Sequence, residues 1–73
     1  MYTVIKPHYV PMAYPDVSTW ATLDDAMADA KRFGYSIVTN NTTGQSATWW
    51  PVEKIWTADP MDSTPVDVKA RLA

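Results

Sequence analysis

Few residues in this chain could perform nucleophilic catalysis. Its 73 residues include one histidine, His8, and no cysteine. A serine or threonine nucleophile needs an adjacent base to activate it, and His8 stands between Pro7 and Tyr9 in a segment that we predict to be irregular. The ordinary interpretation of such a histidine is a surface or half-buried imidazole, so we do not expect an enzyme of this class.

A pair of carboxylates is the second candidate for chemistry. Asp25 and Asp29 are four residues apart on a predicted helix, and two carboxylates on one helix face can bind a hard cation or act as acid and base. Together with His8 they suggest a metal-assisted enzyme. We favour a solvated acidic face instead, because one histidine and scattered aspartates are poor zinc ligands. We expect no catalytic residue, no metal and no cofactor, and two glycines are too few for a glycine-rich phosphate loop.

The aromatic residues are more informative than the ionisable ones. The chain has four tryptophans and four tyrosines, and both types are enriched at the energetic centres of protein interfaces. Trp49 and Trp50 are neighbours on a predicted strand, so their side chains must point to opposite faces of the sheet, and one helix can cover only one face. We predict a partner-binding surface built from Trp50, Trp49, Tyr9, Tyr14, Ile5 and Lys6. The alternative is that Trp20, Trp49 and Trp56 close the core and Trp50 alone is half exposed.

The clearest predicted element is a capped helix over residues 22–34. Thr22 is a good N-cap residue with an acid three positions later, and Gly34 stands where a helix end favours a left-handed residue. Acids in the first turn and bases in the last turn complement the helix dipole. An apolar stripe recurs at helical spacing, formed by Leu23, Ala26, Met27, Ala30 and Phe33. The stripe predicts that this helix lies on one face of a sheet.

Three strands are predicted around this helix, over residues 1–6, 35–39 and 45–50, which are rich in β-branched and aromatic residues. Residues 40–44 have the composition of a hairpin turn. Three prolines predict that residues 7–19 are irregular. The expected fold is α+β, a β-α-β-β domain with a three-stranded, mainly antiparallel sheet and one helix on one face. We favour the strand order first-third-second; the alternative is first-second-third with a parallel pair.

The predicted domain covers residues 1–57, and residues 58–73 are predicted to be a turn-rich linker and tail. Residues 52–56 form either a short fourth strand or an irregular return. Thr64 as N-cap, Pro65 at the first position and Asp67 at the third predict a short helix from Pro65 to Leu72. In a three-stranded sheet the first or second strand could lie at an edge and accept an extended peptide.

Charge and hydropathy exclude several classes of partner. The net charge is −2 and the basic residues are scattered, whereas nucleic-acid binding needs a clustered basic surface. No apolar run approaches the roughly 20 residues of a membrane span, and the first residues do not form the apolar segment of a secretory signal. We expect a cytoplasmic protein that is a monomer when free and binds neither nucleic acid nor membrane directly.

The segment Thr22-Leu23-Asp24-Asp25-Ala26, followed by a helix, a glycine and a strand, resembles short proteins encoded by bacteriophages. It is similar to the small phage inhibitors of bacterial RNA polymerase, in which a Thr-Leu-Asp-x-Ala helix stands among short strands. The resemblance covers less than half of the chain. It implies a non-catalytic protein of the bacterial host cytoplasm that binds a host protein, RNA polymerase being the first candidate, and modulates transcription. It transfers no functional residue, and a protein inhibitor of a host defence nuclease or a self-associating structural component remain alternatives.

Overall fold

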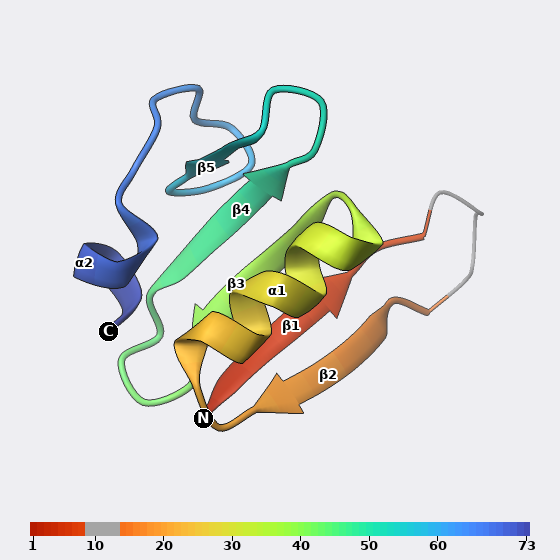
Figure 1. Ribbon diagram of the computed structural model, residues 1–73, viewed down its shortest axis with the longest axis vertical. Helices are drawn as coiled ribbons and strands as arrows, with labels where there is room; N and C mark the ends of the chain where they lie inside the picture. Colours follow the sequence, from red (N-terminus) through yellow and green to blue (C-terminus); the bar gives the residue numbers. More distant parts are fainter. Residues whose placement is uncertain (9–13) are drawn as a thin grey trace.

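The computed structural model describes residues 1–8 and 14–73. In this part of the chain two strands precede the first helix, and three strands and a second helix follow it (Figure 1). The elements in order are β1 (Tyr2–Lys6), β2 (Asp16–Trp20), α1 (Leu23–Phe33), β3 (Ser36–Asn40), β4 (Ser46–Trp50), β5 (Ile55–Thr57) and α2 (Val68–Leu72).

The strands of the described residues form one five-stranded antiparallel sheet in the order β2-β1-β3-β4-β5. The α+β class fits, but the prediction of a three-stranded sheet with one helix is wrong. The main omission is β2, which lies in the segment predicted to be irregular and pairs with β1 from Tyr2↔Trp20 to Lys6↔Asp16. Three of its five residues are polar, and Val17 is 59% exposed, so its sequence lacks the apolar alternation by which a half-buried strand is recognised.

The favoured strand order first-third-second is wrong, and the alternative order first-second-third is correct except for its parallel pair. The centre of the sheet is β3, which pairs with β1 on one side and with β4 on the other. The alternative order had these neighbours but made the first pair parallel. In the structure β2 reverses the chain before α1, so β3 returns antiparallel to β1. The tryptophan strand β4 is therefore not central, and it lies between β3 and β5.

Helix α1 forms as its capping residues predict. The Thr22 hydroxyl accepts a hydrogen bond from the Asp25 backbone N–H at 3.3 Å, and the Gly34 N–H bonds to the carbonyl of Ala30 at 3.0 Å. Gly34 has φ of +125°, a conformation in which a Cβ is strained. The apolar stripe is not as predicted at its end, because Phe33 is 42% exposed and Asp29 is buried instead.

Both helices pack on one face of the sheet. Helix α1 lies across β1 and β3 (Figure 1), and α2 packs beside β4. The buried core contains Val4, Val38, Ala47, Trp49 and Trp56 from the strands, Leu23, Ala26 and Ala30 from α1, and Val68 and Leu72 from α2. Residues predicted to be a tail thus belong to the core. Helix α2 begins later than expected, at Val68, with Asp67 as its N-cap residue.

Candidate functional site

The second face of the sheet carries no helix in the described part of the chain. Strand residues alternate between the two faces, and Val4, Val38 and Ala47 belong to the core under the helices. Their neighbours Ile5, Ile37 and Thr48 therefore lie on the opposite, helix-free face. The strand register aligns one row of residues across this face, namely Val17, Ile5, Ile37, Thr48 and Thr57. Every member of the row is β-branched, and Val17 at its outer end is 59% exposed.

Trp50 stands at the β4–β5 end of the helix-free face. Its neighbour Trp49 is in the core with 8% exposure, whereas Trp50 is half-buried. The Trp50 indole Nε1–H donates to the Thr57 hydroxyl at 2.9 Å, and that hydroxyl donates to the Asp59 carbonyl at 2.8 Å. The Tyr35 ring lies 5.0 Å from the Trp50 ring at an angle of 52°. These contacts hold the indole in one orientation while part of its surface stays accessible.

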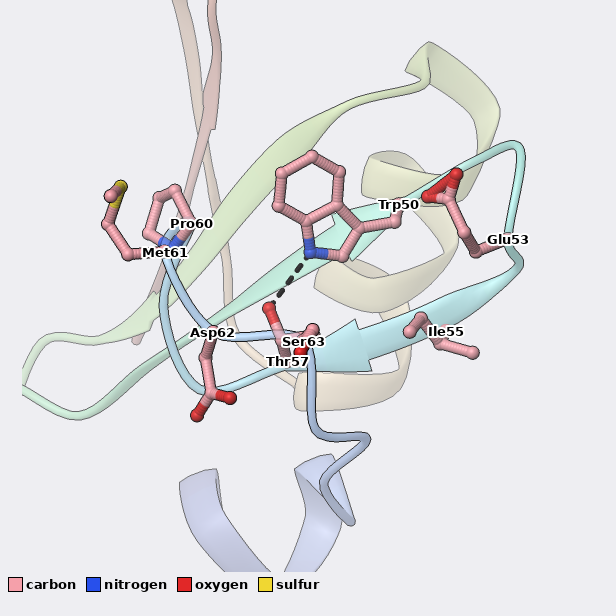
Figure 2. Close-up of a pocket in the computed structure, with 8 residues that line it drawn as sticks. All are labelled: Trp50, Glu53, Ile55, Thr57, Pro60, Met61, Asp62 and Ser63. Atoms are coloured by element: carbon pink, nitrogen blue, oxygen red, sulfur yellow. Dashed lines mark hydrogen bonds between the residues drawn. The ribbon is translucent and has the colours of Figure 1, made fainter.

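A pocket of about 420 Å³ opens beside this indole. Its wall consists of Trp50, Glu53, Ile55, Thr57 and residues 60–63 (Figure 2). The turn over residues 60–63 was predicted only as part of a linker. In the structure it folds back beside β5 and supplies one side of the pocket. We call this hollow the Trp50 pocket.

A second cluster of polar side chains lies on the other face, between α1 and the β1–β2 pair. The Asp29 carboxylate is 2.7 Å from the Lys6 ammonium, accepts a hydrogen bond from the Trp20 indole N–H at 3.1 Å, and also accepts one from the Ser18 hydroxyl. The Arg32 guanidinium approaches it at 3.3 Å. The Asp29 side chain is 10% exposed and that of Lys6 is 14% exposed. Asp29 is therefore a buried anchor between helix and sheet, where the sequence suggested a solvated acidic face.

The environment of Asp29 makes it unsuitable as a catalytic base. Burial raises the pKa of this carboxyl, but hydrogen bonds from Lys6, Ser18, Trp20 and Arg32 lower it more, so that its pKa lies well below the ordinary value. A general base works best with a pKa near the operating pH. The carboxylate is already satisfied by four donors, so its role is to fix α1 to the sheet.

The suggested metal site does not assemble in the described residues. They contain no group of three His, Cys, Asp or Glu side chains that could hold an ion. His8 lies 3.1 Å from the Asp16 carboxylate and contacts the Phe33 ring edge-on, with 5.9 Å between ring centroids. Asp29 is bound to Lys6 instead. His8 and Asp29 therefore make separate local contacts, and Asp25 uses its backbone N–H to cap α1.

The structure separates the residues predicted to bind a partner. Trp50 and the half-buried Ile5 share the helix-free face, while Trp49 is in the core with the Lys31 ammonium 5.2 Å from its ring centroid. Lys6 is on the helix side, bound to Asp29. Tyr14 is 91% exposed just before β2. Tyr9 lies outside the described residues.

The strands predicted as possible edges are both internal. β1 lies between β2 and β3, and β3 is the central strand. The actual edges are β2 and β5. The outer side of β5 is partly occupied, because the Val66 N–H bonds to the Trp56 carbonyl at 2.9 Å and Pro65 bridges to Thr57. Along the outer side of β2 no strand from the described ranges is paired.

Besides Trp50 and Ile55, the walls of the Trp50 pocket are Glu53, Thr57 and residues 60–63, and sequence reasoning did not place these residues beside the indole. The available signal was the run of turn-forming residues after a short β-branched and aromatic segment, which brings the chain back beside its own strand. The pairing Trp50↔Ile55 places these two apolar side chains next to each other on the helix-free face.

Comparison with known proteins identified no relative. No protein-family model matches the chain, and no curated protein or solved structure was found to match it. None of the helices in the described ranges is long and apolar enough to cross a membrane.

Proposed function

We propose that this protein is a non-catalytic binding module whose helix-free face docks on another protein, with Trp50 as the central anchor. The observation that carries the proposal is a half-buried indole held by Thr57 and Tyr35 at the mouth of a pocket, on the sheet face that neither α1 nor α2 covers. Tryptophan is among the residue types most enriched at interface hot spots.

The fixed orientation of Trp50 favours binding in energetic terms. Side chains that become ordered at an interface cost about 0.5–1.5 kcal/mol each, and a side chain that is already held avoids this loss. The accessible members of the β-branched row, Val17, Ile5 and Ile37, add stiff side chains that also lose little freedom. A partner that covers Trp50, Ile5 and Ile37 would gain apolar contact area at a low entropic cost.

The bacterial RNA polymerase of a phage host is the partner that we propose first. The support is the resemblance of the Thr22–Ala26 segment and its helix to small phage inhibitors of that enzyme. Binding in the host cytoplasm would then modulate transcription. A host defence nuclease is the second candidate, since the same surface could block it, and self-association is the third.

Binding to purified bacterial RNA polymerase tests this proposal. Surface plasmon resonance with the full chain is expected to give saturable binding that Trp50→Ala weakens at least tenfold, in line with hot-spot truncations of about 2 kcal/mol or more. Phe33→Ala is the control, because Phe33 is an aromatic residue with an accessible ring that lies at the end of α1, on the other face of the sheet. It is expected to bind like the parent chain.

The possible results separate the parts of the proposal. If the parent chain does not bind polymerase, the choice of partner is wrong. If Trp50→Ala binds as tightly as the parent while it remains folded by circular dichroism, the choice of surface is wrong. Sedimentation of the free protein at rising concentration tests the third candidate, and a monomer throughout excludes it.

A further inference from the structure

We propose that the Trp50 pocket binds a cationic side chain, an arginine or lysine, presented by the partner protein. This inference rests on the proposed function for the assumption that a partner protein docks on this face. The choice of a cationic side chain rests on the residues of the pocket itself. Two residues in the wall carry formal charge at neutral pH, Glu53 and Asp62, and both are acidic. No lysine, arginine or histidine is among the described residues of the wall.

The two carboxylates have no cation of their own within the described ranges. The ion pairs found there use Lys6, His8, Arg32 and Lys69, and none of them involves Glu53 or Asp62. One oxygen of Asp62 accepts the Thr64 backbone N–H at 2.9 Å, which fixes the carboxylate and leaves its second oxygen available. Figure 2 shows the Glu53 and Asp62 side chains on opposite sides of Trp50 and Thr57. The Asp62 carboxylate points away from the indole in this view, so both acids stand at the rim of the pocket, where they give its surroundings a negative charge that no lysine, arginine or histidine of the wall compensates.

The aromatic wall suits a cation as well. A tryptophan face attracts an ammonium or guanidinium group within about 6 Å of the ring centroid. Because the Trp50 N–H is already bonded to Thr57, the ring offers its π surface and not its donor. The chain makes such a contact with the neighbouring indole on the other face, where Lys31 lies 5.2 Å from the Trp49 centroid. In the Trp50 pocket the partner would supply the cation.

The shape of the pocket fits a long side chain. Its volume of about 420 Å³ lies within the usual range of about 300–1,000 Å³ for ligand sites. Ile55, Pro60 and Met61 supply apolar surface, along which the methylene stem of a lysine or arginine can pack while its charged head stays near the acidic rim. A neutral apolar side chain would leave the carboxylates unused, and an acidic one would be repelled. The net charge of −2 favours the approach of a basic partner surface.

Titration with small probes tests the inference without the partner. The probes are Nα-acetyl-arginine amide and Nα-acetyl-lysine amide, with Nα-acetyl-citrulline amide as the neutral isostere, followed by NMR at the Trp50 indole N–H. A cationic probe is expected to give saturable shifts confined to Trp50, Ile55 and residues 60–63, and citrulline is expected to bind at least fivefold more weakly. The E53Q/D62N variant is expected to weaken cation binding about fivefold, as for loss of solvent-accessible ion pairs.

The D24N/D25N variant is the matched control. It removes the same charge from the first turn of α1, on the other face, and is expected to bind the probes like the parent chain. Equal binding of citrulline, unchanged binding in E53Q/D62N, or shifts that spread over the surface without saturation would each overturn the inference. Since the readout does not involve polymerase, a failed polymerase experiment leaves this result interpretable, and the reverse also holds.

Discussion

The substitution Asp29→Asn is expected to destabilise the fold by about 3 kcal/mol at pH 7, because it leaves a buried lysine without its counterion. Arg32 is 69% exposed and loses little, and Ser18 and Trp20 can still donate to the amide oxygen. Lys6 is only 14% exposed and lies 2.7 Å from the carboxylate, so the loss of its ion pair makes the largest contribution to the destabilisation. For a domain of this size about 3 kcal/mol corresponds to a fall in Tm of roughly 12–24 °C.

The assay is urea denaturation followed by tryptophan fluorescence between pH 7 and pH 2. The pKa of Asp29 is lower in the folded than in the unfolded state, where it is about 3.9. The contribution of Asp29 to the free energy of unfolding is therefore complete above about pH 5. It is lost as the pH falls below about 4 toward the pKa of Asp29 in the folded state. The difference in unfolding free energy between the parent and Asp29→Asn should shrink over that range.

Two further variants make the Asp29 experiment decisive. Asp24→Asn removes a carboxylate whose partner Lys69 is 66% exposed, and the expected cost is below about 1 kcal/mol. Replacing Lys6 by Met together with Asp29→Asn removes both charges, and this double variant should be more stable than Asp29→Asn alone. The reasoning is refuted if Asp29→Asn costs no more than Asp24→Asn, or if its cost stays constant down to pH 2.

Two matched pairs test other features of the fold by urea denaturation. Gly34→Ala is expected to cost about 1–3 kcal/mol, because φ is +125° and the strain lies in the backbone alone; Gly44→Ala, with φ of +78°, should cost less, and the reverse order would contradict this. Thr57→Val is expected to cost about 1–2 kcal/mol, because its hydroxyl accepts the indole N–H of the pocket tryptophan. Thr48 is equally buried on the same face, but its hydroxyl has no partner among the described residues. Thr48→Val should therefore be neutral or stabilising, and a cost equal to that of Thr57→Val would argue against this assignment of hydrogen bonds.

The parts of the fold that were predictable depend on interactions between near neighbours in sequence. The ends of α1 follow from Thr22 and Gly34, whose caps bond within a few residues. The separation of Trp49 from Trp50 follows from the alternation of a strand. Strands β1, β3 and β4 were found because their β-branched and aromatic runs end at turns or prolines.

Only the tertiary structure decided which of these elements are neighbours. β2 is an exposed edge strand, and its pairing with β1 is not visible in its own sequence pattern. Because β2 turns the chain back before α1, β3 runs antiparallel to β1. Likewise, the burial of Asp29 depends on Lys6 from β1 and on Ser18 and Trp20 from β2, two strands on which α1 packs. Contacts of this kind join residues far apart in sequence, and a single chain's local pattern carries no signal for them.

The sequence by itself determined that one large indole would be turned away from the helix layer, because adjacent strand residues cannot share a face. The tertiary structure alone decided what surrounds that indole. Thr57 and residues 60–63 reach Trp50 only after β5 pairs with β4 and the following turn folds back, and Leu72 closes the core on the opposite side with no exposed surface. The physical reason is that strand alternation is a property of the local backbone, whereas a pocket wall is assembled from segments whose meeting depends on the whole sheet.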